Sequence, residues 1–262
     1  RIRRALWRVS LAFVCFCALG VSAATAPPKA AIASAHPLAT EAGYRILEQG
    51  GNAFDAAVTV AAVLAVVEPY SAGLGGGGFW LLHRASDRKE IMVDARETAP
   101  RGISMSMYVD EEGVPIPGAT LRGGKAAGIP GVPAGMVHLA RRYGKLRLSQ
   151  LLAPAIAIAR DGFAIDARFA RVAKVREELL RDGTNTARIF LAGNAAPAQG
   201  YLLKQPDLAA TLESIAQHGR DGFYGGRVAA SLVKGVQAAG GVWTKADLAG
   251  YRIVERPPVR FN

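Results

Sequence analysis

Cysteine is almost absent from this sequence, and its absence excludes several kinds of protein. The only two among 262 residues, Cys15 and Cys17, both lie in an apolar stretch near the N-terminus. Beyond residue 17 the sequence therefore offers neither disulfide staples nor a cysteine nucleophile. A folded protein without staples needs a large hydrophobic core, and half of the residues here are hydrophobic.

Other patterns that carry chemistry are also missing. The histidines do not have the spacing of metal ligands, and the sequence contains no G-x-S-x-G elbow of a serine hydrolase. No basic stretch is interleaved with aromatic residues, as a nucleic-acid site requires. The sequence therefore predicts no metal, no cofactor and no nucleic-acid partner. The four histidines are His36, His83, His138 and His218.

The first 23 residues have the pattern of a signal peptide. Residues 1–8 are rich in arginine, residues 9–21 are apolar, and Val21-Ser22-Ala23 supplies small residues before a cleavage point. The apolar stretch is shorter than the roughly 20 residues that span a bilayer. No small residues precede the cysteines as in a lipoprotein, so no stable membrane anchor is expected. We predict a signal peptide over 1–23, a spacer over 24–30, and a periplasmic or secreted bacterial protein.

Charge and composition indicate a folded protein of one large or two small domains. The formal net charge is +11, and four of the arginines lie in the first eight residues. Thirty glycines and 20% charged residues argue against both disorder and a coiled coil. The positive excess favours solubility and attraction to anionic surfaces.

The chain is organised around residues 71–100, which contain a glycine run. Gly73 to Gly78 formally satisfies G-x-G-x-x-G. A dinucleotide-binding turn needs a strand before the glycines and a helix after them, whereas a helical pattern precedes this run and a strand pattern follows it. Two interpretations remain: glycines that allow positive φ and close approach of backbone or ligand, or a flexible turn.

Periodicity predicts helices and strands in layers. Ala53–Val67 is apolar on nearly every side and too short for a membrane span, so we expect a central helix packed between layers, capped by Asn52. Two strands, Phe79–His83 and Glu90–Asp94, should form a hairpin. Further predictions are a buried strand over Ala30–Ala35, a helix from Asp166 to Leu180, a helix capped by Ser149 and a strand over Tyr251–Glu255. The fold class is therefore α/β, with a layered core.

Arg96 lies immediately beyond the second hairpin strand, at the end of a sheet, where side chains often point into a pocket. A guanidinium there could clamp a substrate carboxylate through two parallel hydrogen bonds. The residues alone favour the simpler alternative, a structural ion pair with Asp94 or Glu97.

The sequence resembles the γ-glutamyltransferases, or γ-glutamyltranspeptidases, of the N-terminal-nucleophile hydrolases. The resemblance runs in the family's order over nearly all of residues 31–262, and its motifs are highly specific together. They are EAGYRILEQGGNAFDAAVTVAAVLAVVEP, GLGGGGF, DARETAP, GIPGVPAGM, YGKL, LLAPAIAIARDGF, QPDLAATLESIAQHG, FYGGRVA, GGVWTKADLAGY and ERPPV.

This resemblance implies a four-layer αββα sandwich, incomplete in this chain, and a precursor that cleaves itself. The new N-terminal threonine would take the γ-glutamyl group from a donor such as glutathione as an acyl-enzyme, with its own α-amine as the base. Water, an amino acid or a peptide would then accept the group. The family's D-x-R-E arginine holds the donor's α-carboxylate and matches Arg96; Glu97 matches the neighbouring glutamate, in a supporting role.

Residues 31–262 are expected to form a large-subunit region truncated at its C-terminus, because the threonine and the oxyanion-hole glycines do not occur in it. The small subunit produced by self-cleavage would then be a partner. Three alternatives stay open: a cephalosporin or glutaryl acylase, a polyglutamate-processing relative, and a catalytically silent scaffold that binds carboxylates.

Overall fold

The computed structural model describes residues 30–261, which include a small part of one unit, Arg1–Ile32, and nearly all of a second, Ala33–Asn262. The predicted signal peptide and most of the spacer lie outside the described residues. The helices are α2 (Pro37–Glu48), α3 (Ala53–Val67), α4 (Val132–Arg142), α5 (Leu148–Asp161), α6 (Ala167–Val175), α7 (Glu177–Asp182), α8 (Thr184–Phe190), α9 (Pro206–His218), α10 (Asp221–Tyr224), α11 (Gly226–Ala238) and α12 (Lys245–Gly250). The strands are β1 (Gly78–Arg84), β2 (Lys89–Ala95), β3 (Phe163–Ala164), β4 (Leu202–Leu203) and β5 (Val254–Arg256).

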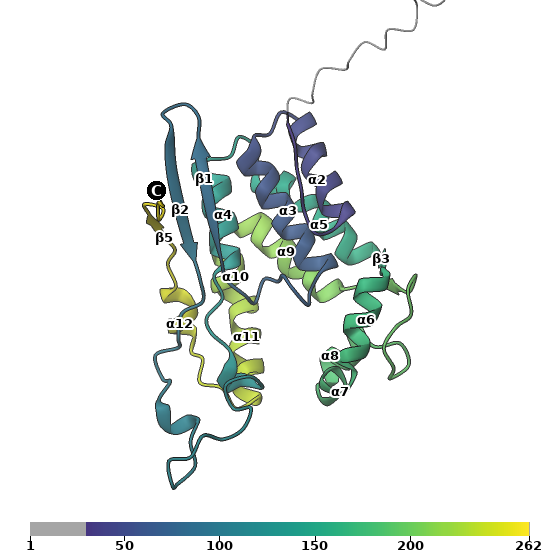
Figure 1. Cartoon of the computed structure of the whole chain (residues 1–262), viewed down its shortest axis with the longest axis vertical. Coiled ribbons are helices and arrows are strands. Elements are labelled where there is room, and N and C mark those ends of the chain that lie inside the picture. The colour runs from purple at the N-terminus through teal and green to yellow at the C-terminus, as the bar shows by residue number, and fades with distance from the viewer. Residues whose placement is uncertain (1–29, 262) are drawn as a thin grey trace, which may run out of the picture. The chain divides into compact units, whose positions relative to one another are not determined.

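Helix α3 is the central helix that its composition predicts. Asn52 accepts hydrogen bonds from the Phe54 and Asp55 amides, and Asp55 accepts one in return from the Asn52 amide, which completes a capping box. The helix packs against α2, α4 and α5, and α5 packs in turn against α9 (Figure 1). Most of its side chains are buried, so neighbouring elements cover the apolar surface of this helix, as its composition predicts.

The sheet beside this helical layer has the strand order β1-β2-β5, and its neighbouring strands are antiparallel. One face of the sheet lies against α4 (Figure 1). Trp80 and Val93 form a cross-strand pair on that face, and the Trp80 ring packs against Gly135. Leu81 and Met92 form a pair on the opposite face. Phe79 and Leu81 are more than half exposed there, so within the described residues helices cover one face of this sheet only.

Two predicted elements are wrong. Residues 30–35 form no strand, and Ala31, Ala33 and Ala35 are exposed; alanine has little preference for strands, and a run of small apolar residues does not by itself indicate burial. The helix predicted from Asp166 to Leu180 divides into α6 and α7 at Arg176, although Asp166 does cap α6.

Other differences concern the ends of elements. Helix α5 begins after Arg147 and not at Ser149, because the Gln150 side chain accepts a hydrogen bond from the Arg147 amide. The strand predicted over Tyr251–Glu255 begins later, at Val254. The short pair β3–β4 and the single-turn helix α10 have too few residues for a periodic pattern to identify them.

Candidate functional site

The glycine run forms one wall of a cleft of about 580 Å³. The remaining walls come from the end of α3, the segment after it, β1, the exit of β2 and the start of α4; they include Leu64, Tyr70, Trp80, Glu97 and Val132. Helix α3 precedes the glycines and β1 follows them, so the order of elements is the reverse of a dinucleotide-binding turn, as the sequence indicates.

Backbone hydrogen bonds fix this run against the entry to α4. The Gly76 carbonyl accepts hydrogen bonds from the amides of Gly131, at 2.9 Å, and Val132, at 3.0 Å. Just past β2, Thr98 and Ile129 exchange two further backbone hydrogen bonds. The glycine run, the exit of β2 and the start of α4 are therefore joined into one backbone framework.

Close approach, and not unusual φ angles, explains the glycines. None of the glycines from Gly73 to Gly78 has a positive φ. A Cβ added at Gly77 would lie 2.5 Å from Glu97 Oε2 and 2.7 Å from the Ala95 carbonyl oxygen, whereas one added at Gly75 would meet nothing within 4 Å. At Gly77 the close-approach interpretation holds, and the idea of a merely flexible turn does not.

The structure separates the two residues singled out from the sequence. Glu97 lines the cleft, whereas Arg96 lies outside its lining with 57% of its side chain exposed. The Arg96 guanidinium lies 5.9 Å from the centre of the Phe79 ring. Its main chain is held firmly: the amide donates to Asp94 Oδ1 at 3.1 Å, and the carbonyl accepts from the Tyr251 hydroxyl at 2.8 Å.

The ion pair proposed as the simpler role of Arg96 forms only in part. Arg96 Nε lies 3.4 Å from Glu97 Oε2, without a hydrogen bond between them. The Asp94 carboxylate does not pair with Arg96; it accepts instead from Arg256 Nε at 2.9 Å. No carboxylate in residues 30–261 therefore occupies the planar edge of the Arg96 guanidinium in a two-point contact.

Glu97 has an unusual environment for a carboxylate. Its Oε2 atom is buried and lacks a hydrogen-bond partner within the described part of the chain. Its stem packs beside Gly128, where an added Cβ would lie 2.9 Å from the Glu97 Cβ. A buried carboxylate oxygen without a donor is costly, so this atom is suited to receive a donor from a ligand or from another part of the protein.

The cleft lining also contains Tyr70, next to the buried carboxylate of Glu68. Burial and the negative charge of Glu68, to which the Tyr70 hydroxyl donates at 3.2 Å, raise the pKa of Tyr70 to about 12. Arg168 approaches the same carboxylate at 3.4 Å. Tyr70 is therefore a neutral hydrogen-bonding group at ordinary pH and not a general base.

The described residues form neither a metal-binding cluster nor a membrane-spanning helix. Nowhere in 30–261 do three or more histidine, cysteine, aspartate or glutamate side chains gather as metal ligands would. Over the same residues, no helix combines the length and apolar character needed to cross a bilayer.

Comparison with known proteins identifies the family. The family model for gamma-glutamyltranspeptidase matches residues 39–262, a range that includes the glycine run, Arg96 and Glu97. The chain belongs to the gamma-glutamyltranspeptidase family. The resemblance drawn from the sequence motifs is thereby confirmed.

Several proteins of similar sequence are named glutathione hydrolases. Over 258 residues the chain is 39% identical to the glutathione hydrolase proenzyme of Pseudomonas sp. (strain A14). The matched region covers 96% of this chain and 45% of that protein. This γ-glutamyltranspeptidase-family chain thus spans about half the length of the curated relatives it matches.

Solved structures confirm the predicted fold class. The Helicobacter pylori gamma-glutamyltranspeptidase superposes with a TM-score of 0.84 and 41% identity over 87% of this chain and 65% of its own. A cephalosporin acylase from Bacillus halodurans has a TM-score of 0.78 and 29% identity, over 91% of this chain and 47% of its own. The acylase named as an alternative is thus a more distant neighbour.

Sequence reasoning missed several residues that build this site. Tyr251 holds the Arg96 carbonyl from 155 positions away, and Gly131 and Val132 hold the Gly76 carbonyl. Their motifs, GIPGVPAGM and GGVWTKADLAGY, carried part of the resemblance, but nothing local in those motifs indicates which distant backbone atoms they contact.

Proposed function

We propose that the complete protein containing this chain transfers and hydrolyses γ-glutamyl groups. It would take the group from a donor such as glutathione as an acyl-enzyme and pass it to water, an amino acid or a peptide. Membership of the family supports this function, as does the greater identity to a glutathione hydrolase proenzyme than to an acylase.

The observation that carries the proposal is that the Arg96 backbone is fixed while its guanidinium is exposed. Its backbone is fixed from two sides by Asp94 and Tyr251, while its guanidinium is exposed and makes only a loose contact with Glu97. A fixed backbone with an unoccupied planar edge is what a carboxylate clamp requires, because a guanidinium binds carboxylate oxygens two at a time. We assign Arg96 to the donor's α-carboxylate and Glu97 to a supporting, positioning role.

The nucleophile would lie in the part of the relatives' length that this chain does not span. The Pseudomonas relative is named a proenzyme. We infer that this protein is likewise a precursor, cleaved to expose a threonine whose α-amine acts as its base. Residues 31–262 would then be a large-subunit region, with the small subunit as its partner.

We further propose that the protein is exported after cleavage near Ala23 and acts in the periplasm or outside the cell. The arginine-rich and apolar pattern of residues 1–23 supports this location. N-terminal sequencing of the exported protein should begin near Ala24; a mature protein that retains Arg1 to Arg8 would contradict it.

The function is tested with Arg96→Lys in the complete protein. Lysine keeps the charge but loses the planar fork. A charge-assisted hydrogen bond contributes about 1.5–3 kcal/mol, so KM for a γ-glutamyl anilide should rise by about one to two orders of magnitude. A donor that lacks the α-carboxylate should react almost equally with both proteins.

The matched control is Arg256→Lys. Arg256 is also 57% exposed on this sheet, but it pairs with Asp94. We expect its KM for the anilide to stay near the wild-type value. Equal penalties on both donors, with a lower melting temperature, would make Arg96 a structural residue. Absence of γ-glutamyl transfer from the complete wild-type protein would favour the silent scaffold, and preference for an acyl-cephalosporin donor would favour the acylase.

A further inference from the structure

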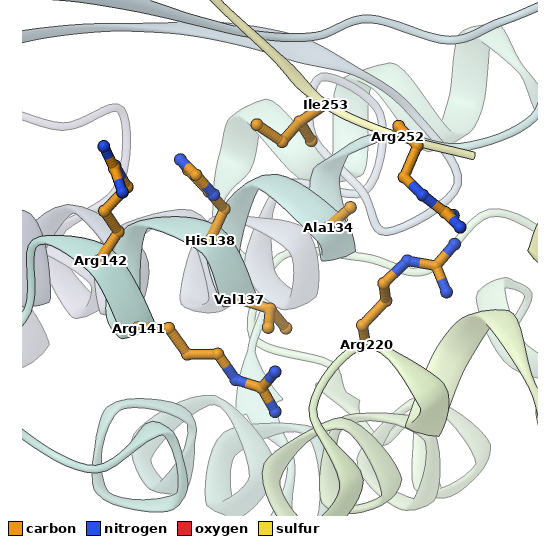
Figure 2. A pocket seen from close by; sticks show the side chains of 8 residues that line it. All are labelled: Ala134, Val137, His138, Arg141, Arg142, Arg220, Arg252 and Ile253. Carbon is orange, nitrogen blue, oxygen red and sulfur yellow. The ribbon is translucent and has the colours of Figure 1, made fainter. Parts of the chain in front are cut away.

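A second cleft, of about 460 Å³, lies along α4 (Figure 2). It is bounded by α4, the connection between α9 and α10, and the segment before β5. Arginines dominate its polar lining, and Ala134, Val137 and Ile253 supply an apolar wall. The polar lining residues are His138, Arg141, Arg142, Arg220 and Arg252.

These polar side chains fall into two groups. Figure 2 shows Arg142 and His138 pointing to one side of α4, where both contact the Glu255 carboxylate, at 3.2 Å and 2.7 Å. Arg141 extends from the opposite side of the helix toward the α9–α10 connection. Glu255 therefore contacts the first group, whereas Arg141 has no carboxylate partner among residues 30–261.

Arg141 is the least compensated of the lining residues. It is exposed, and no residue from 30 to 261 forms an ion pair or a hydrogen bond with its guanidinium. Its Nη2 atom lies against Gly219, where an added Cβ would come within 2.4 Å of it. Gly219 also has a φ of +62°, so glycine is favoured there for the backbone turn, and the end of the Arg141 side chain lies where a Cβ would be.

Arg220 and Arg252 provide two further guanidinium groups, which main-chain carbonyls hold in place. Arg220 donates to the carbonyls of Ala249 and Tyr251, each at 2.8 Å, and stacks 4.8 Å from the centre of the Tyr224 ring. Arg252 donates to the same two carbonyls at 2.7 Å. Asp221 forms a long ion pair with Arg220, at 3.7 Å, and is almost fully exposed, so it offsets the positive charge only weakly.

Sharing two carbonyls brings the two guanidinium groups together, although like charges repel. Burial, and then the positive charge of Arg252, lower the pKa of Arg220. Carbonyl oxygens at the end of α12 reduce this repulsion but carry only partial negative charge. An anion placed between Arg141, Arg220 and Arg252 would remove it, and the guanidinium groups would need little reorganisation to bind it.

We propose that this arginine cleft, lined by Arg141, Arg220 and Arg252, binds a compact oxyanion with two or more negative charges. Guanidinium forks match the paired oxygens of phosphate and carboxylate groups alike. Three cations around a cleft of this volume fit a small polyanion of either type better than a single carboxylate. The site is separate from Arg96 and does not depend on the proposed acyl transfer.

The test is isothermal titration of the complete protein with pyrophosphate and, separately, with citrate, at constant ionic strength in chloride buffer. We expect saturable binding of at least one of them, weakened by added salt because the lining is exposed. Tighter binding of pyrophosphate would identify a phosphate site, and tighter binding of citrate a carboxylate site. Absence of binding by both anions would overturn the proposal.

Variants locate the binding. Arg141→Gln should weaken it about tenfold or more, and Arg141→Glu should abolish it, with little change in melting temperature because Arg141 has no partner to lose. Arg171→Gln is the matched control, since Arg171 is an exposed arginine on α6 that likewise has no ion pair among the described residues. Binding that is equally strong in the Arg141 variants would place the anion elsewhere and refute the assignment.

Discussion

Gly77 lies where the glycine run crosses the exit of β2, and its missing side chain is what lets the two backbones meet. The Ala95 carbonyl and the Glu97 amide and carboxylate all occupy the space that a Cβ would take. Of these atoms only the carboxylate belongs to a movable side chain, so the backbone itself would have to shift. A shift there would move Arg96, which lies between the two contacts.

Gly77→Ala should therefore destabilise the protein by about 1–3 kcal/mol, the usual cost of overpacking, and raise KM for a γ-glutamyl donor. Urea unfolding and donor kinetics measure the two effects. Gly75→Ala is the control, because it lies in the same run with open space around it and an ordinary φ. If the two variants are equally stable, the run is a flexible turn after all.

Tyr224 joins three segments through one buried side chain. Its hydroxyl donates to the Pro130 carbonyl at 2.7 Å and accepts from the Ala134 amide at 3.2 Å, while its ring stacks on Tyr251. Burial raises the pKa of Tyr224 well above its ordinary value, which keeps the hydroxyl protonated.

Tyr224→Phe should keep the stack but leave two backbone groups without partners, at a cost of about 1–3 kcal/mol. Chemical unfolding monitored by circular dichroism gives the change in free energy. Tyr201→Phe removes a hydroxyl that makes no hydrogen bond among residues 30–261 and should be neutral. A loss of less than about 0.5 kcal/mol for Tyr224→Phe would mean that the hydroxyl is not needed.

At the scale of elements, α6 and α7 show where sequence reasoning works and where it does not. Asp166 accepts a hydrogen bond from the Phe169 amide, and Asn52 caps α3, both as their residue types and positions predict. These interactions are local, so the sequence contains all of their parts. The break at Arg176 depends on Glu177, which bonds to the Ala196 amide in a distant loop.

At the candidate site, too, local features could be predicted from the sequence and long-range contacts could not. The position of Arg96 at the exit of β2 could be read from the hairpin, whereas the contacts that fix it come from Tyr251, Gly131 and Gly77. Such contacts depend on how elements pack, which periodicity does not encode. Family resemblance supplied the fold because it draws on many weak motifs at once.

Glu177 should make the stability of the junction between α6 and α7 depend on pH. A hydrogen bond from Lys174, followed by one from the Ala196 amide, lowers the pKa of Glu177 from 4.5 to about 2. A carboxylate whose folded pKa lies below its unfolded value stabilises the fold above the unfolded pKa and loses that effect as the pH falls toward the folded one. The stabilisation should thus be complete above about pH 5 and decline between about pH 4.5 and 2.

Melting temperatures of the wild type and Glu177→Gln, measured from pH 7 down to pH 3, test this. The variant should melt lower at pH 7, and the difference should shrink steadily below about pH 4.5. Glu178→Gln is the control, because the Glu178 side chain forms no ion pair within the described range. A difference that does not change with pH would mean that packing, and not charge, fixes the junction.

At the scale of the whole protein, the outer face of the sheet needs explanation. Alternation and register place Phe79 and Leu81 of β1, Met92 of β2 and Val254 of β5 on this face, opposite the side that packs on α4. Three of these side chains are 45% to 65% exposed. An apolar strip of neighbouring strands is typical of an interface, and β1 and β5 each have one edge without a partner strand in residues 30–261.

We propose that a segment matching the part of the relatives' length that this chain does not span, more than half of it, packs on this outer face as the second sheet of the sandwich. Leu81→Asp in the complete protein would then bury a charge without a partner, and maturation to two subunits should fall severely. Leu121→Asp is the control: Leu121 is even more exposed, at 81%, but lies in the loop before α4. Gel analysis of the cleaved fraction, beside the melting temperature, compares the two. Equal maturation of both variants would show that the outer face stays open to solvent, and the partner of this chain would have to bind elsewhere.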